Sequence, residues 1–186
     1  IKDGEATKKY IFHLLPSGML YPHVTCVIGN GVVLHVETLF EELELLKKEG
    51  YDVESRLKIS DRVALLFDYH KLMDSAEEDS KGNYKVGTTR RGIGPAYSDK
   101  INRKGLRLCD LAHWETFEKQ YRKNLIRHQE VYGFDYLPEG ELAVLRQYKE
   151  RLLAMMTDAG LFLSEAVRSG KKVLVEGDIV HTFSNK

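Results

Sequence analysis

The sequence predicts an α/β fold in which a mixed sheet is flanked by helices and joined to a helix-rich lobe. Two observations carry this prediction. The first 60 residues contain short runs rich in β-branched residues, separated by turns with glycine or proline. The second half contains long stretches in which apolar residues recur three or four positions apart, as on one face of a helix. Strands and helices mixed along one chain are typical of helices packed on a sheet.

In the first half, two short strands are expected before the first helix. They are followed by another apolar run that leads into that helix: the three segments are Tyr10–Leu15, His23–Ile28 and Val32–Val36. The helix is expected to begin at Thr38, because Glu41 three residues later completes a capping box, and to end at Gly50. Leu39, Leu43 and Leu46 share its apolar face.

Further elements follow from the same patterns. A short strand is expected first, then a helix with an apolar face, a polar loop, two long helices and a final strand. Their ranges are Arg56–Ser60, Asp61–Ala76, Glu77–Lys85, Trp114–Tyr132, Glu141–Val167 and Lys172–Val175.

The composition limits the classes of partner. The 186 residues are 42% hydrophobic and 30% charged, with 28 basic and 28 acidic side chains. This excludes a disordered chain and predicts a packed fold. With no net charge, the chain has no general attraction to nucleic acid or an anionic membrane, so neither is expected as a partner. Any anion site must be local.

Cysteine content and termini bear on compartment. Cys26 and Cys109 show no C-x-x-C spacing and are too few for a disulfide framework, which favours a reducing compartment. No apolar run approaches the roughly 20 residues that span a bilayer, and the first residues, IKDGEATKK, lack the apolar part of a signal peptide. The cytoplasm is therefore expected. The chain begins at Ile1 rather than Met and ends abruptly at Lys186, as an internal fragment would.

One segment, Val86–Arg107, concentrates residue types that bind anions. It holds four glycines, two threonines and six cations: Gly87, Gly92, Gly94, Gly105, Thr88, Thr89, Arg90, Arg91, Lys100, Arg103, Lys104 and Arg107. Glycines let backbone N–H groups approach a ligand, hydroxyls donate to phosphate oxygens, and guanidinium groups bind them in pairs. A short helix over Ala96–Lys104 would present several positive charges to one phosphate or carboxylate.

Pattern alone leaves two interpretations of this segment open, an anion-binding site and an ordinary surface turn before a basic helix. Glycine-rich turns before basic helices are also common on protein surfaces. The segment fits neither the G-x-x-x-x-G-K-[ST] pattern nor a strand-bounded G-x-G-x-x-G pattern. Elsewhere, the seven histidines are scattered without H-x-x-x-H spacing, so no metal site is expected in this chain.

A resemblance to a known family decides between the two interpretations of the segment Val86–Arg107. TTRRGIGPAYSDK followed by RKGLRLCDL resembles the signature segment of adenylosuccinate synthetases. Stretches similar to the family also occur, in order, on both sides of it: FHLLPSG, VTCVIGNGVVLH, ELELLKKEG, RLKISDR, LLFDYHKLMD and KVLVEG. The resemblance implies a phosphate-loop NTPase-like synthetase fold. It also implies four parts of one partial domain: a strand and helix part (1–76), an IMP-loop segment (77–112), a helical lobe (113–170) and a return strand (171–186).

The resemblance implies a reaction. In the family, GTP phosphorylates the 6-oxygen of IMP, and the amino group of L-aspartate displaces that phosphate to give adenylosuccinate, with Mg²⁺ assisting. This is the first committed step of AMP synthesis. Thr89 resembles the threonine that binds the IMP phosphate, and Arg103 resembles the arginine that reaches the same phosphate from the neighbouring subunit of a homodimer. Thr88, Lys100 and Arg107 resemble supporting residues, as does Thr182, a possible remnant of an IMP-binding threonine.

The chain departs from the family in what it lacks. The glycine-rich phosphate loop with its catalytic aspartate and lysine is absent, as are the catalytic histidine and the GTP-binding and aspartate-binding portions. No catalytic residue and no Mg²⁺ ligand is therefore expected here, and the isolated chain is expected to be inactive. The alternative function is a non-catalytic fragment that binds a nucleoside monophosphate or only dimerises.

Overall fold

The computed structural model describes residues 2–3, 6–7, 9–80 and 87–177. The helices are η1 (Ser17–Leu20), α1 (Val36–Lys48), η2 (Glu54–Arg56), α2 (Asp68–Ser80), α3 (Ile93–Ile101), η4 (Leu108–Ala112), α4 (Trp114–Tyr132), α5 (Glu139–Met155) and α6 (Ala159–Arg168). The strands are β1 (Lys2–Asp3), β2 (Ala6–Thr7), β3 (Cys26–Ile28), β4 (Val33–His35), β5 (Leu57–Ser60), β6 (Ala64–Leu66) and β7 (Met156–Thr157). No helix in these ranges is long and apolar enough to cross a membrane.

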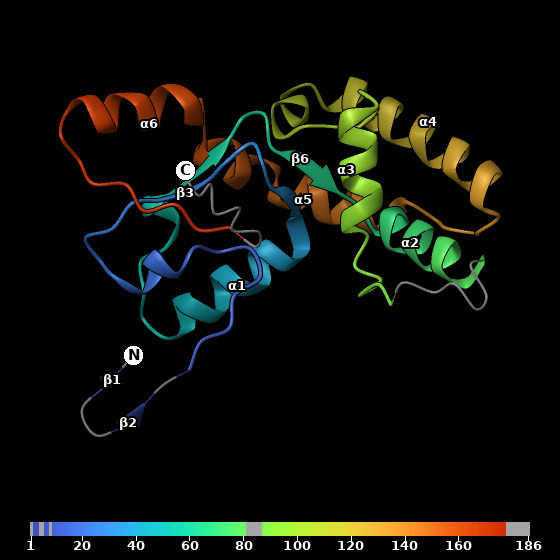
Figure 1. Cartoon of the computed structure of the whole chain (residues 1–186). Helices are drawn as coiled ribbons and strands as arrows, with labels where there is room; N and C mark the ends of the chain where they lie inside the picture. Colours follow the sequence, from blue (N-terminus) through green and yellow to red (C-terminus); the bar gives the residue numbers. More distant parts are fainter. Residues whose placement is uncertain (1, 4–5, 8, 81–86, 178–186) are drawn as a thin grey trace, which may run out of the picture.

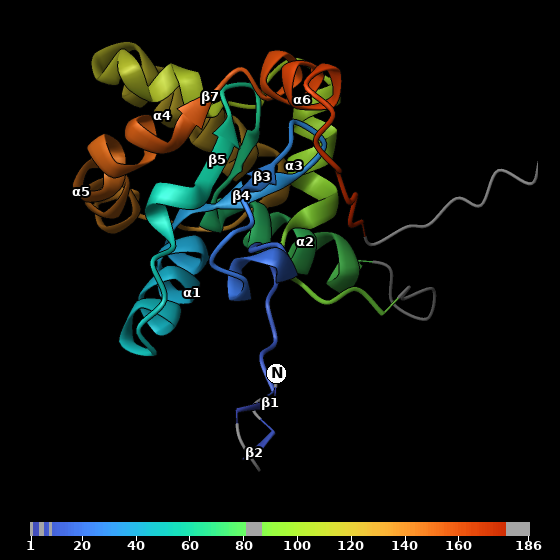
Figure 2. The same cartoon turned by 90° about the vertical axis from the view of Figure 1, so that its left-hand side faces the viewer.

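Two small parallel sheets form the centre of the fold. One has the strand order β3-β5-β7 and the other pairs β4 with β6, while β1 and β2 form a separate antiparallel hairpin. Figure 2 shows the strands in the middle of the molecule, with α1 and α5 to the left and α2 and α3 to the right. Parallel strands need crossover connections, and α1 lies in the connection from β3 to β5 and in the one from β4 to β6. The predicted α/β class with flanking helices is confirmed.

One hydrophobic core joins the two halves of the chain. It runs from Leu15 to Met155 and includes side chains of α1, α2, α4 and α5. Between α1 and α5, Phe40 stacks on Tyr148 with ring centroids 3.8 Å apart. Between α2 and α4, Tyr69 and Tyr121 are fully buried and meet edge to face. The long helices α4 and α5 therefore pack on the elements of the first half (Figure 1).

Several predicted elements are confirmed. The expected helix Trp114–Tyr132 coincides with α4, and the strand expected over Arg56–Ser60 coincides with β5 to within one residue. The runs His23–Ile28 and Val32–Val36 contain β3 and β4. The three leucines predicted to share one face of α1 are fully buried.

The strand predicted over Tyr10–Leu15 is wrong. The buried carboxylate of Glu42 on α1 accepts the backbone N–H groups of His13, Leu14 and Leu15, at 2.6, 3.2 and 3.0 Å. A side chain thus satisfies donors that a neighbouring strand would otherwise take. The capping box at Thr38 is also wrong: α1 begins at Val36, and the imidazole of His35 caps it by accepting the N–H of Thr38.

Two long helices were predicted where the chain changes element. The range Asp61–Ala76 is divided between β6 and α2. All three residues of β6 are apolar and buried, as in a parallel strand covered on both faces, so they lack the alternation of apolar and polar residues that marks a strand in the sequence. The range Glu141–Val167 is divided into α5, β7 and α6. Met156 and Thr157 leave the helix to pair with β5, and Asp158 then caps α6 by accepting the N–H of Leu161.

The return strand predicted over Lys172–Val175 is not formed. Residues 171–177 have no regular secondary structure, and Leu174 and Val175 are each 85% exposed. Within the described ranges no strand pairs with this segment; Lys171 donates to the backbone oxygen of Ala166, and Glu176 accepts from Ser17. The residues 178–186 and 81–86, including Thr182 and most of the polar loop predicted after Glu77, lie outside the described residues.

A buried polar cluster joins α2, α3 and α4. Oδ2 of the Asp99 carboxylate on α3 accepts hydrogen bonds from Nε2 of His128 at 2.8 Å and from Nε2 of His70 at 3.4 Å. Because Nδ1 of His70 accepts the N–H of Phe67, its Nε2 carries the proton donated to Asp99. Burial raises the pKa of Asp99, but the hydrogen bonds from both histidines outweigh it and hold that pKa well below its usual range. Burial lowers the pKa of His70.

These shifts predict acid sensitivity. An aspartate with a depressed pKa contributes stability above pH about 4, and this stability is lost as the pH falls. A histidine that is kept neutral in the folded state favours the unfolded state below pH about 6.5, because there it can take up a proton only when the chain unfolds. Both terms act in the same direction. The free energy of unfolding of the chain, measured by urea denaturation, should therefore fall below pH about 6.5 and fall again below about 4.

The variant Asp99→Asn tests the cluster directly. Both imidazoles bond to the same oxygen, Oδ2 of Asp99. An asparagine can keep an oxygen there but removes the negative charge that strengthens both hydrogen bonds, so at pH 7 we expect a loss of about 2–3 kcal/mol. The second fall, below pH about 4, should become shallower because the titrating carboxyl is gone. An unchanged pH profile in this variant would contradict the assignment.

Candidate functional site

The predicted anion-binding segment surrounds α3. The chain enters the helix through an exposed turn that carries Thr88 and Thr89, and it leaves through a second exposed turn that carries Arg103. The helix spans Ile93–Ile101 and not Ala96–Lys104 as predicted, since its N-cap is Gly92. Arg103 and Lys104 therefore lie beyond its end and do not share a helical face with Lys100.

Both turns have unusual backbone conformations. Among the described residues, Arg90 and Arg103 are the non-glycine residues with positive φ, at 52° and 59°. The left-handed region costs an L-residue roughly 1–2 kcal/mol, and strained positions cluster at functional sites. Arg103 follows the helix end, where glycine is the usual residue. An arginine in that position suggests that its side chain has a role that outweighs the strain.

Gly92 is required for close packing and not for ligand approach. Its φ is 76°, and a Cβ atom built there would lie 2.7 Å from the backbone carbon of His70 and the backbone nitrogen of Lys71. Its N–H donates to Oδ2 of Asp74 at 3.0 Å. Gly92 thereby presses the start of α3 onto α2. By contrast, the position of Gly87 is open, although its φ is also 76°.

The cations of the segment have separate surroundings. The Lys100 ammonium donates to the backbone oxygen of Asn30 and lies 5.6 Å from the centre of the Tyr97 ring, while the Tyr97 hydroxyl donates to the backbone oxygen of Gly31 at 2.7 Å. These contacts attach α3 to the turn between β3 and β4. Burial, followed by the charge of Arg107, lowers the pKa of Lys100.

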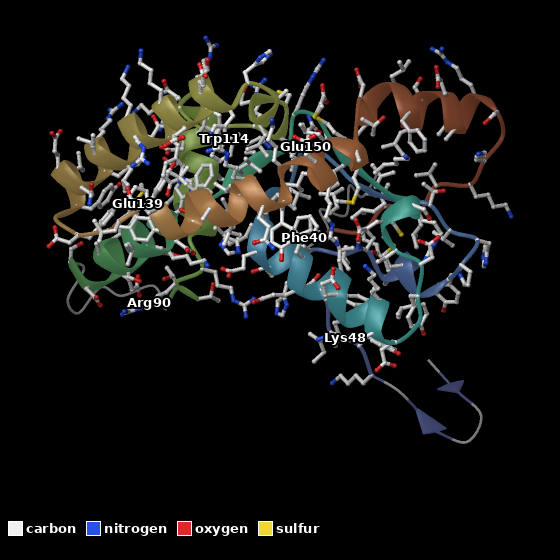
Figure 3. All side chains as sticks on the ribbon, turned by 180° about the vertical axis from the view of Figure 1, so that it is seen from behind. Phe40, Lys48, Arg90, Trp114, Glu139 and Glu150 are labelled. Atoms are coloured by element: carbon white, nitrogen blue, oxygen red, sulfur yellow. The ribbon has the colours of Figure 1, made fainter. Side chains whose placement is uncertain are left out.

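Arg90 forms an exposed ion pair. Its guanidinium donates to Asp79 at the end of α2 over 2.7 Å, with both side chains about half exposed. Figure 3 shows Arg90 at the lower edge of the molecule. An exposed pair of this kind contributes little to stability, so the arginine is available to a ligand at small cost.

The structure separates the two residues predicted to bind one phosphate. Thr89 precedes α3 and Arg103 follows it, so the nine-residue helix lies between them. At about 1.5 Å per residue, its length is roughly 13 Å. Lys100 and Arg107 lie toward the Arg103 end, close enough for the charge of one to affect the other. The site therefore has two parts, a threonine turn at one end of α3 and a cationic turn at the other.

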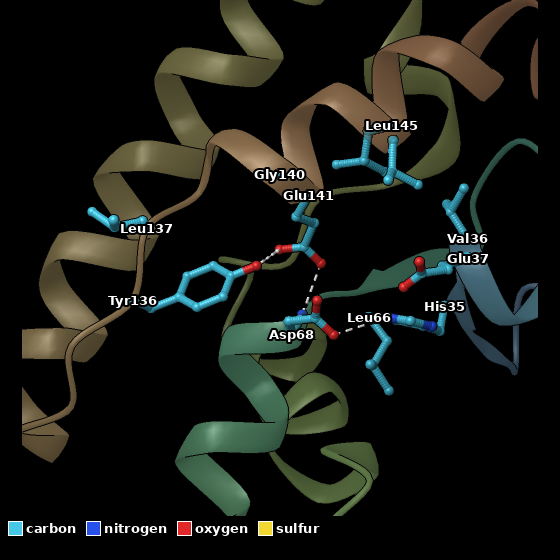
Figure 4. A pocket seen from close by; sticks show the side chains of 11 residues that line it. His35, Val36, Glu37, Leu66, Asp68, Tyr136, Leu137, Gly140, Glu141 and Leu145 are labelled. Atoms are coloured by element: carbon cyan, nitrogen blue, oxygen red, sulfur yellow. Dashed lines mark hydrogen bonds and ion pairs between the residues drawn. The ribbon is translucent and has the colours of Figure 1, made fainter.

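Sequence reasoning missed a pocket of about 400 Å³ that is lined by both polar and apolar side chains. Figure 4 shows His35, Asp68, Tyr136 and Glu141 turned toward it. Glu141 accepts the N–H of Asp68 at 2.7 Å and the hydroxyl of Tyr136 at 3.2 Å, and burial raises its pKa. These residues come from distant parts of the chain and follow no local motif, so no sequence signal could have grouped them.

The pocket contains a set of groups with the chemistry of a metal site. Donor atoms of His35, Glu37 and Asp68 lie within 4.8 Å of one another. The Lys71 ammonium, however, lies 2.6 Å from Oδ1 of Asp68 and already supplies a positive charge. His35 is engaged as well: its Nδ1 accepts the N–H of Thr38, and its Nε2 lies 3.3 Å from Oδ1 of Asp68 and 3.1 Å from the Lys71 ammonium. Two of the three groups, His35 and Asp68, are therefore already engaged by protein partners, and a set with an imidazole and an adjacent ammonium does not fit Mg²⁺, which prefers oxygen ligands.

Comparison with known proteins identifies relatives of the chain. A family model described as adenylosuccinate synthetase matches residues 3–181. Adenylosuccinate synthetase of Phaeodactylum tricornutum is 46% identical over 91% of this chain and 32% of its own length. Adenylosuccinate synthetase 1 of Laccaria bicolor is 46% identical over 94% of this chain and 41% of its own length. The chloroplastic adenylosuccinate synthetase of Chlamydomonas reinhardtii is also 46% identical, over 93% of this chain and 38% of its own length.

A solved structure agrees with these relatives. Fully ligated adenylosuccinate synthetase from Plasmodium falciparum superposes with a TM-score of 0.86 at 39% identity, covering 91% of this chain and 40% of that one. The chain thus spans about a third to two fifths of the length of the relatives it matches.

The two glycines before α3 give a matched pair of variants. Gly92→Ala adds a Cβ against backbone atoms that cannot turn away, so we expect a loss of at least about 3 kcal/mol of stability. Gly87→Ala has the same positive φ but open space, so we expect a loss of about 1–2 kcal/mol. Equal losses in urea denaturation would show that α3 is not held against α2 at Gly92.

Proposed function

This chain belongs to the adenylosuccinate synthetase family, and on that premise we propose that it supplies the phosphate-binding part of the IMP site of a GTP-dependent ligase that joins IMP to L-aspartate. The observation that carries the proposal is the exposed, strained segment around α3, in which Thr89 and Arg103 occupy the two ends of one helix. Its hydroxyls and guanidinium groups have the chemistry that a phosphate monoester requires.

Thr89 is proposed to donate its hydroxyl to a phosphate oxygen, with Thr88 beside it. Both side chains are exposed, and the turn leads directly into the first turn of α3. The N-terminus of a helix carries a partial positive charge that favours anions. Arg91 is exposed in the same turn and adds a full positive charge.

Arg103 is proposed to serve the phosphate bound by a second subunit. A phosphate held at Thr89 would lie about a helix length from Arg103 of the same chain, beyond comfortable reach. A homodimer that brings the Arg103 turn of one protomer to the Thr89 turn of its partner removes this difficulty. Arg107 is a candidate for supporting charge there. The contacts of Lys100 with Asn30 and Tyr97 instead favour a structural role for that lysine.

The remaining chemistry is assigned to residues outside this sequence. Transfer of a phosphoryl group from GTP relies on positioning and charge stabilisation, which Mg²⁺ supplies when bound. The described residues contain no unengaged ligand set that fits this ion, so we propose that Mg²⁺, GTP and aspartate are held by other parts of the complete enzyme. The alternative, a fragment that binds only a nucleoside monophosphate or dimerises, uses the same segment.

The cytoplasm is the proposed compartment. Its support is the free state of Cys26 and Cys109, which fits reducing conditions. The name of the Chlamydomonas reinhardtii relative places that protein in the chloroplast.

Substitutions at the two ends of α3 test the phosphate site. We expect Thr89→Val and Arg103→Leu each to weaken IMP binding about tenfold or more in calorimetric titrations, since each removes a hydrogen bond to a charged group. Inosine, which lacks the phosphate, should bind all variants alike. Arg168→Leu, an exposed arginine at the end of α6, is the control. Unchanged IMP affinity in both site variants would refute the proposed site.

Arg103→Gly separates function from strain. Glycine adopts the positive φ of this position without penalty, so the variant should be at least as stable as the parent while binding IMP as weakly as Arg103→Leu. A gain in stability with a loss of affinity is the result expected when a strained residue is kept for its side chain.

A further prediction concerns the isolated 186 residues. With no residue assigned to proton transfer or to GTP, the chain should form no adenylosuccinate from IMP, aspartate and GTP with Mg²⁺, although it should bind IMP. Measurable GTP-dependent product formation would overturn this division of labour.

A further inference from the structure

Two carboxylates of α2 face the turn that carries Thr88 and Thr89. Asp74 and Glu78 lie one helical turn apart, on the same face of α2, and only 8% and 3% of their surface is exposed. Carboxylates are rarely buried unless a specific partner compensates the loss of water. Each of these two has such a partner in the backbone of the phosphate-binding segment.

The partners are the N–H groups at the two ends of the threonine turn. Gly92 donates to Oδ2 of Asp74 at 3.0 Å, and Gly87 donates to Oε1 of Glu78 at 2.6 Å. Hydrogen bonds from N–H groups to an ionised acceptor are shorter and stronger than neutral ones. The four residues between the glycines, Thr88 to Arg91, therefore form a loop that is held at both ends by one helix.

The geometry at Gly92 leaves the loop no room to slide. Backbone atoms of His70 and Lys71 occupy the space where a side chain at Gly92 would project, 2.7 Å from the position of a Cβ. His70 in turn is fixed to α3 by its bond to Asp99. The exposed Arg90–Asp79 ion pair adds little to this attachment, because exposed pairs are weak.

We propose that Asp74 and Glu78 are positioning residues that hold the Thr88–Thr89 turn in the shape that receives the phosphate of IMP; this rests on the proposed function of that turn. Neither carboxylate attracts a phosphate, since both carry negative charge. Their effect is therefore geometric: they fix the backbone of the turn before the ligand arrives, which lowers the entropy lost on binding.

A geometric effect can be distinguished from a charge effect by paired substitutions. Asp74→Ala removes the acceptor and should weaken IMP binding about tenfold. Asp74→Asn keeps an oxygen acceptor for Gly92 and removes the opposing charge, so its affinity should stay within about threefold of the parent. A residue that merely contributed to overall stability would give no such rescue of affinity. Glu77→Ala is the matched control, because Glu77 is a carboxylate of the same helix that accepts from Tyr132 instead.

The same variants of the full chain are to be examined by NMR with ¹⁵N-labelled glycine. In Asp74→Ala, the Gly92 amide should exchange with solvent at least tenfold faster, whereas Gly133 at the end of α4 should be unchanged because its partner, Gln129, is not altered. Glu78→Gln and Glu78→Ala provide the corresponding pair at Gly87. Thus two separate amides report on the two attachments.

The outcomes separate the two claims. Faster exchange at Gly92, weaker IMP binding by Asp74→Ala and recovery by Asp74→Asn together support the inference. Normal IMP affinity in Asp74→Ala, with the parent binding IMP, would overturn the inference alone. Absence of IMP binding by the parent chain would overturn the proposed function, and the inference with it.

Discussion

The Asp99 carboxylate is the interaction on which the arrangement of α2, α3 and α4 depends. It is one buried charge that accepts from an imidazole on each of the two flanking helices. Well-packed apolar residues often stabilise a core as well as a buried ionic group does. They do not, however, specify one rotation and one height of α3 between its neighbours, which a two-sided hydrogen bond does. We regard this constraint as the reason for keeping a charge there, because the proposed site depends on where the two ends of α3 lie.

The polar residues of α2 extend the same constraint. His70, Asp74 and Glu78 are spaced four residues apart, so they form a buried polar stripe along one face of the helix. The first holds α3 through Asp99, and the other two hold the backbone that leads into α3. A helix that usually would be expected to bury only its apolar face thus has a second buried face, which serves a loop rather than the core. The apolar residues Tyr69 and Met73 meanwhile pack against the core as their spacing predicts.

Buried polar residues such as these also set the limit to what could be predicted from the sequence. Where burial and hydrophobicity coincide, as along α4 or on the leucine face of α1, periodicity located the elements to within a few residues. Where a polar group is buried, periodicity gave a wrong prediction, because nothing in the spacing of residues 10–15 indicates that Glu42 accepts the N–H groups of His13 and Leu15. The break at Met156 depends on β5, almost a hundred residues earlier in the chain. For the site, composition predicted an anion, and only the family resemblance distinguished Thr89 and Arg103 from the other polar residues around them.

The separation of Thr89 from Arg103 has a consequence for how binding and assembly are coupled. A rigid α3 fixes the two residues about a helix length apart, so in the proposed dimer one chain would carry halves of two different phosphate sites. If a phosphate is shared between protomers, each ligand bound adds to the free energy that holds the dimer together, and dimerisation raises the affinity for the ligand by the same factor. That coupling requires the helix between the two turns to resist bending and rotation. The buried Asp99 cluster near its end and the contact of Gly92 with α2 at its start provide that resistance, which links the polar core of this chain to the proposed sharing of its site.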